Sequence, residues 1–206
     1  MEFGIKGDHE ELNWLKPMLR RWGHLIDDYC AIHPKDVPYY YNERANVGLL
    51  AAAAWGPGSG SLEEYACERD HDEGQVRWGR ADLYLYDQNN SATIEAKQIW
   101  WTPQTTENHI RAQLEAAANQ AGTNREANVA VAAVFATLML SCRDDVQAGR
   151  ADVQAQCRRA VDQMNNVGTD LTAWVMPCME NPLVHNNRDE VSCLWPGIVL
   201  GLQVVV

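Results

Sequence analysis

Hydrophobic residues recur at three- and four-residue spacing in four segments, and this spacing is typical of amphipathic helices. Pro17 lies inside the first segment and could kink its helix, while Pro34 and Pro38 end it. A run rich in Gly and Pro, residues 56–61, ends the second segment. The pattern therefore predicts helices over residues 12–32, about 40–55, 105–121 and 147–165.

Other segments show the patterns of strands. Residues 80–86 alternate, with Ala81, Leu83 and Leu85 on one face and Asp82 and Tyr84 on the other. The polar run 87–90 is a turn signal, so we expect a hairpin between 80–86 and 92–99. Further strands are expected at 62–69, 129–140, 171–176 and 198–206, with a polar loop over about 179–196.

This order of elements predicts an α/β fold, a mixed central sheet flanked by helices. The 206 residues suit one domain with an ordinary globular composition. We expect three parts within it: an N-terminal helical extension (1–38), a core (40–140) and a C-terminal helix with strands that complete the sheet (141–206). Without a signal peptide or a bilayer-length apolar run, we expect a cytoplasmic protein with no membrane contact.

The cysteines and histidines do not predict a zinc site. Zinc-binding loops place ligands about two to four residues apart, and the six cysteines are far more widely scattered. The six histidines have no ligand-like spacing either.

Asp82, Glu95 and Lys97 form the strongest candidate site. Residues two apart on a strand share a face, so Glu95 and Lys97 project together and Ala96 points away. If the two strands pair, Asp82 joins them at one end of the sheet. Two carboxylates and the Ala96 carbonyl would suit Mg²⁺ or Mn²⁺, and a neighbouring ammonium favours phosphoryl chemistry. Lys97 is also the only lysine after residue 35.

Here the sequence resembles the PD-(D/E)xK superfamily, the restriction-endonuclease-like nucleases. Asp82 matches the first carboxylate, and Glu95-Ala96-Lys97, after 12 intervening residues, matches the second half of the motif. Ala81 stands where the family has proline. Residues 40 to about 140 follow the family's αβββαβ order. The resemblance implies a metal-dependent nuclease, with DNA favoured as substrate.

The resemblance also implies two helical site residues. Glu43 matches a glutamate that helps to bind or orient metal, and Gln113 matches a glutamine found after the lysine strand in several branches. Ala117 replaces the tyrosine that follows in one branch.

The same residues have structural readings. Glu95 and Lys97 could be an edge-strand ion pair, Asp82 could precede a turn, and Glu43 and Gln113 could be ordinary helix-surface groups. The net charge of −11 also counts against nucleic-acid binding. Two alternatives therefore stay open: a degenerate fold that binds a protein partner through its acidic surface, and a subunit of a larger nuclease or an inhibitor-held toxin. The pattern leaves the oligomeric state open.

Several aromatic and basic residues could contact nucleic acid. Trp100 and Trp101 could stack on unpaired bases or form a hydrophobic lid, whereas Trp55 and Trp174 fit a core. Phosphate contacts are conceivable, with no sign of a shared face, for Arg77, Arg80, Arg111 and Arg125.

Overall fold

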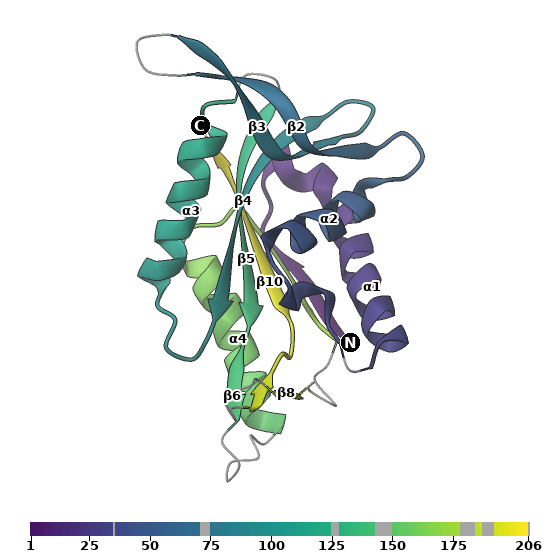
Figure 1. Cartoon of the computed structure of the whole chain (residues 1–206), viewed down its shortest axis with the longest axis vertical. Coiled ribbons are helices and arrows are strands. Elements are labelled where there is room, and N and C mark those ends of the chain that lie inside the picture. Colours follow the sequence, from purple (N-terminus) through teal and green to yellow (C-terminus); the bar gives the residue numbers. More distant parts are fainter. Residues whose placement is uncertain are drawn as a thin grey trace.

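A seven-stranded mixed sheet forms the centre of the molecule (Figure 1). The computed structural model describes residues 1–34, 36–70, 75–124, 128–142, 150–177, 184–186 and 192–205. The strand order is β1-β7-β10-β5-β4-β3-β2. These strands are β1 (Glu2–Lys6), β2 (Gly60–Asp70), β3 (Val76–Tyr86), β4 (Ser91–Trp101), β5 (Val129–Leu138), β7 (Leu171–Met176) and β10 (Ile198–Val205).

Helices cover both faces of this sheet, which confirms the predicted α/β class (Figure 1). One core cluster joins one face to α1 (Lys16–Ile32) and α2 (Glu43–Ala54). The other cluster joins the opposite face to α3 (Glu107–Ala121) and α4 (Arg150–Asn166). The β4 strand contributes to both: Ala92, Ile94 and Ala96 face α1 and α2, and Ile99 and Trp101 face α3 and α4.

From α2 to β5 the elements follow one another as helix, three strands, helix, strand, as the pattern predicted. β2, β3 and β4 pair antiparallel in sequence, and β4 then pairs parallel with β5. Because a parallel neighbour needs a crossover connection, α3 carries the chain back across one face of the sheet. This return places the end of α3 beside the middle of β4.

The N-terminal segment differs from the expected helical extension. Residues 2–6 form β1, an edge strand paired antiparallel with β7. The expected helix over 12–32 is divided into a short 3₁₀ helix, Glu10–Leu15, and α1. Pro17 lies in the first turn of α1, where a missing N–H costs nothing, so it marks a helix start rather than a kink. A second 3₁₀ helix, Pro38–Tyr40, precedes α2.

The C-terminal part adds a small second sheet. β5 ends at Leu138, and the expected longer strand continues as a separate one, β6 (Leu140–Cys142). The segment expected as a loop contributes β8 (Val184–Asn186) and β9 (Ser192–Leu194), and the order is β6-β9-β8. Residues 147–149 of the expected fourth helix lie outside the described residues. No helix in the described ranges has both the length and the apolar character needed to cross a bilayer.

Candidate active site

The candidate residues meet where β3 separates from β4. The two strands pair from Tyr86↔Ser91 to Leu83↔Ile94, and Asp82 and Glu95 would form the next pair. Beyond this point the β3 side of β4 has backbone groups without a strand partner, and buried N–H groups need acceptors. An Asp82 oxygen, Oδ2, accepts the N–H of Ala96 at 2.8 Å. The Glu43 carboxylate accepts a hydrogen bond from the Gln98 backbone. The carboxylates of Asp82 and Glu43 thus accept backbone hydrogen bonds of β4 in place of a neighbouring strand. The site therefore lies at the middle of β4, and not at the end of the sheet, where the sequence analysis placed it.

An irregular position in β2, at Glu64, lies beside the same point. Glu64 has a φ of 50°, in the left-handed region, and the β2–β3 register skips Glu64 and Asp82. Before it, Ser61 Oγ donates to the Ala51 carbonyl of α2. After it, Cys67 accepts from Asn124, which follows α3. Ser61 and Cys67 are both odd-numbered, so in a regular strand they would lie on the same face of the sheet. Here Ser61 contacts α2 on one face and Cys67 contacts the segment after α3 on the other, so the two halves of β2 present opposite faces on either side of Glu64.

Glu95 is 3% exposed and forms an ion pair with Arg69 of β2. Arg69 also donates to the Gln120 carbonyl at 3.0 Å, to Thr123 Oγ1 at 3.3 Å and to the Arg80 carbonyl. Burial lowers the pKa of Arg69, but the hydrogen bond and charge of Glu95 outweigh it and raise the pKa above its usual value. Arg69 therefore stays a cation that ties β2 to β4 and to the end of α3. The sequence patterns gave no sign of this role.

Burial and a like charge both act on Glu95. Loss of solvent, followed by repulsion from Asp82, raises the pKa of Glu95 from 4.5 to about 7. Arg69 and then Lys97 act in the opposite direction and do not cancel the shift. The two acids are thus near enough to repel each other, and Glu95 lies within the field of two basic groups.

The ammonium group of Lys97 faces this cluster. Nζ donates to the Ala96 carbonyl at 2.9 Å and to Gln120 Oε1, on α3, at 2.6 Å. Its charge lowers the pKa of both Glu95 and Glu43. The structure therefore brings Asp82, Glu95, Lys97 and Glu43 into one electrostatic cluster.

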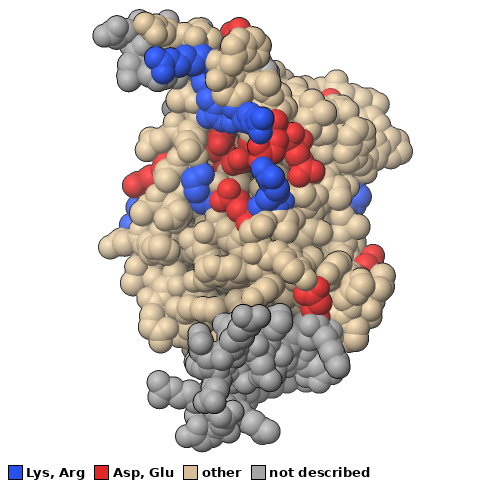
Figure 2. Space-filling view, in the orientation of Figure 1, with Lys and Arg blue, Asp and Glu red and all other residues tan. Residues whose placement is uncertain are grey.

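Glu43 and Asp82 line a pocket that connects this cluster with solvent. The carboxyl lies in the first turn of α2, and Asn42 caps the helix by accepting the N–H of Ala45 at 2.8 Å. Burial first, and Asp82 to a smaller degree, raise the pKa of Glu43 despite Lys97. The pocket, about 270 Å³, is lined by Asn42, Glu43, Arg44, Val47, Glu63, Glu64 and Asp82. Figure 2 shows acidic and basic side chains gathered beneath the β2–β3 hairpin on a face that otherwise carries little charge.

Gln120, and not Gln113, is the α3 glutamine that contacts Lys97. Gln113 lies two helical turns earlier, and no contact described for this chain joins it to the cluster.

The donor set fits a magnesium-like ion in part. Asp82, Glu95 and the Ala96 carbonyl offer hard oxygen atoms, and the repulsion between the acids would be relieved by a cation. Within the described residues, no group of three or more His, Cys, Asp or Glu side chains could hold a metal ion. Glu43 is therefore not gathered with both acids into one ligand group. Mg²⁺ typically uses one or two carboxylates together with water and substrate phosphate, and two acids satisfy that need.

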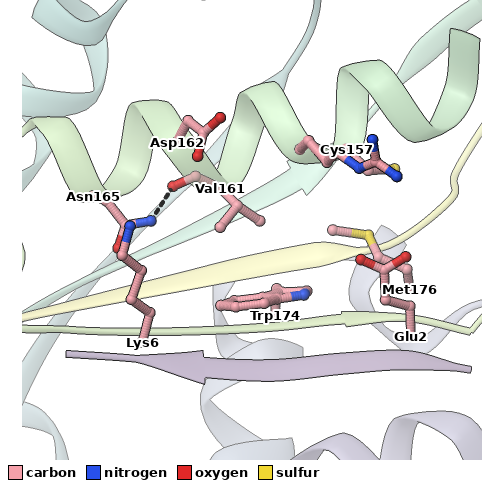
Figure 3. A pocket seen from close by; sticks show the side chains of 9 residues that line it. Glu2, Lys6, Cys157, Val161, Asp162, Asn165, Trp174 and Met176 are labelled. Atoms are coloured by element: carbon pink, nitrogen blue, oxygen red, sulfur yellow. Dashed lines mark hydrogen bonds between the residues drawn. The ribbon is translucent and has the colours of Figure 1, made fainter.

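A second pocket lies away from these acids, between α4 and the strands β1 and β7. It has a volume of about 260 Å³, and Figure 3 shows Trp174 on one side and Val161 and Asp162 of α4 on the other. A Cβ on Gly4 would lie 2.1 Å from the Trp174 ring, so glycine permits the ring to cover β1. Its rim carries both signs of charge, from Glu2, Lys6, Arg158 and Asp162.

The tryptophans are arranged differently from the sequence expectations. Trp55 was expected in the core, but it caps α2 and is 59% exposed. Trp101 is fully buried and donates to Gln163 at 2.8 Å, so it cannot stack on a base together with Trp100. Trp100 is 43% exposed and packs near Tyr40 and Trp195. Of the expected phosphate contacts, Arg77 and Arg80 are on β3, Arg111 is on α3, and Arg125 lies outside the described residues.

No family model, curated protein or solved structure matches this chain.

Proposed function

We propose that this chain is a metal-dependent nuclease with a restriction-endonuclease-like core. The helix–three strands–helix–strand order supports this fold, as do the antiparallel meander β2-β3-β4 and the parallel strand β5. The substrate class that the motif favours is DNA. Asp82 and Glu95 would hold Mg²⁺ or Mn²⁺ with the Ala96 carbonyl.

One contact carries the proposal. The Asp82 carboxylate accepts the Ala96 N–H at 2.8 Å, directly between Glu95 and Lys97. This bond links the two halves of the motif across the opening between β3 and β4. A surface ion pair would not need a second acid at that position, nor a glutamate that is almost completely buried.

Each side chain has a defined task in hydrolysis. A bound divalent cation supplies Lewis-acid chemistry, since it acidifies water and neutralises phosphate charge. The Lys97 ammonium orients the attacking water and stabilises the negative charge that develops at phosphorus. Gln120 holds that ammonium through Oε1. Glu43 binds the backbone of Gln98 and shapes the open side of the site.

Lys97→Ala tests the proposal. The variant should lose at least about a hundredfold of the Mg²⁺- or Mn²⁺-dependent cleavage rate, because a positioned charge is missing in the transition state. Its far-ultraviolet circular dichroism should match that of the unmodified chain. Lys6→Ala, at the distant edge strand β1, is the control and should retain cleavage. Single-stranded and duplex DNA, and RNA, should all be assayed.

Substantial cleavage by Lys97→Ala would remove the role assigned to lysine. Absence of cleavage of every substrate by the unmodified chain would overturn the nuclease proposal itself.

A second candidate function is a metal-free binding module or a nuclease subunit. The metal-free module is favoured by Arg69, which already supplies Glu95 with a cationic partner from within the chain. In that case, calorimetry with Mn²⁺ should show no binding that depends on Asp82 and Glu95. A subunit would bind the metal but would cleave only after a partner is added.

A further inference from the structure

The outer half of the β2–β3 hairpin, residues 65–70 and 76–81, is here named the arm. It extends past the neighbouring strands and curves across the top of the sheet (Figure 1). Arg69 anchors it to the end of α3 and to Glu95. Arg69, one residue before the end of β2, therefore holds the outer part of the arm against α3 and β4, beside the candidate site.

The arm presents an aromatic ring and basic groups to solvent. Trp78 is 74% exposed, and the Arg80 side chain is 72% exposed. Pairing of Trp78 with Glu68, and of Arg80 with Ala66, puts Trp78 and Arg80 on one face. Arg77 pairs with Arg69 on the other face, and it is also exposed.

The face with Trp78 leads towards the acids. Trp78 and Asp82 are four residues apart on β3, or about 13 Å. Between them Arg80 approaches Glu64 at 3.5 Å, and Arg44 of α2 contacts Glu64 at 2.7 Å. Such exposed ion pairs contribute little free energy, so a phosphate can compete for both arginines. Figure 2 shows the basic side chains running from the hairpin to the acidic cluster.

We propose that the arm binds single-stranded nucleic acid, with an unpaired base stacked on Trp78 and phosphates on Arg80 of the arm and Arg44 of α2. That this strand is then presented to Asp82 and Glu95 rests on the proposed function. Aromatic stacking on a base needs an open π-face, which a duplex does not offer. A chain of net charge −11 is also repelled less by a single strand than by the denser charge of a duplex.

The test measures binding without cleavage. Fluorescence anisotropy of labelled single-stranded DNA, single-stranded RNA and duplex DNA is followed in EDTA at low salt. Trp78→Ala should weaken single-strand binding about tenfold, as expected for loss of one stacked base. The double variant Arg44→Ala/Arg80→Ala should weaken it and flatten its salt dependence. Comparison of the DNA and RNA strands shows which sugar the arm accepts.

Matched controls come from the same chain. Trp55→Ala removes another exposed tryptophan, and Arg111→Ala removes an arginine nine residues before Gln120 on α3. Both should bind within about twofold of the unmodified chain, a change well below the loss of a stacked base. Because Trp78 is mostly exposed, its removal should leave the circular dichroism unchanged.

The proposal is overturned if duplex binds more tightly than single strands, or if Trp78→Ala binds as well as Trp55→Ala. It is also overturned if Trp78→Ala changes only the oligomeric state in light scattering, which would make the arm a contact between copies. If Trp78→Ala still cleaves and its single-strand binding is unchanged, the binding role of the arm is contradicted and the nuclease proposal is not. If binding depends on the arm but no metal-dependent cleavage occurs, the nuclease proposal is contradicted and the binding role of the arm is not.

Discussion

At the scale of single residues, the site combines two acids and two basic groups, and one of the acids, Glu95, is almost completely buried. Burial and Asp82 raise the pKa of Glu95 to about 7, although Arg69 and Lys97 oppose the shift. Keeping the Glu95 carboxylate charged in these surroundings costs free energy, and pKa shifts of this kind are common where a protein binds a cation or a substrate. Burial and Asp82 likewise raise the pKa of Glu43.

The raised pKa of Glu95 predicts how stability depends on pH. The folded chain binds this proton more tightly than the unfolded chain, whose glutamate has a pKa near 4.5. The stabilisation is therefore complete below about pH 4.5 and is lost as the pH rises through about 7. Glu95→Gln stays neutral and avoids this loss. In EDTA, its free energy of unfolding relative to the unmodified chain should rise by on the order of 2–3 kcal/mol from acidic to basic pH.

Urea unfolding at several pH values measures this difference. Parallel pH profiles for the two proteins would show that Glu95 does not bind its proton more tightly in the folded state.

Gln120 supports a second prediction. Gln120→Ala frees the Lys97 ammonium from its 2.6 Å contact, and a loosened catalytic group should lower the cleavage rate about tenfold. Gln113→Ala, on the same helix, should cleave normally. Steady-state rates with Mn²⁺ distinguish the two. Equal losses would return Gln113 to the site, and no loss in Gln120→Ala would make its contact structural only.

The sequence was sufficient to predict that Asp82, Glu95 and Lys97 lie close together, because a strand has a strict period of two and a hairpin sets the register. The sequence was not sufficient to predict the role of Arg69. Its contacts depend on the irregular position in β2 at Glu64, which no local sequence pattern predicts. Gln113 was selected from the family resemblance, whereas the glutamine that contacts Lys97 is Gln120, two turns further along α3.

At the scale of elements, strong periodicity located β7, α2 and α3 well. β1 was missed because five residues offer too short a pattern, and its place at the sheet edge depends on β7. β3 begins four residues before the expected strand, since the apolar residues Val76 and Trp78 are even-numbered and do not continue the odd-numbered apolar pattern of the expected strand. Pairing with β2 extends it, which is tertiary structure overriding local preference.

Gly4 provides a prediction at this scale. A Cβ there would lie 2.1 Å from the Trp174 ring, so Gly4→Ala must displace the ring or the edge strand. We expect a loss of about 1–3 kcal/mol in the free energy of unfolding. Gly48→Ala in α2 is the matched control, because its nearest group is a Glu63 oxygen at 3.4 Å. The control should be neutral or gain up to about 1 kcal/mol from helix propensity.

Thermal or urea unfolding compares the two variants. A Gly4→Ala chain as stable as Gly48→Ala would show that the contact between β1 and Trp174 is loose.

At the scale of the whole molecule, a net charge of −11 opposes contact with any polyanion. The basic side chains near the site are local exceptions, provided by Arg44, Arg69, Arg77, Arg80 and Lys97. A divalent cation at the acids would reduce the repulsion further, so metal loading and substrate binding should support each other.

Mn²⁺ calorimetry tests the central claim most directly, because every catalytic role above assumes a cation held by Asp82 and Glu95. The unmodified chain should bind Mn²⁺, and Asp82→Asn should weaken that binding by at least about tenfold, as expected for loss of a charged ligand. Asp162→Asn, an acid at the rim of the pocket under α4, should bind as the unmodified chain does. Equal Mn²⁺ affinity in Asp82→Asn, or no binding by the unmodified chain, would contradict the account.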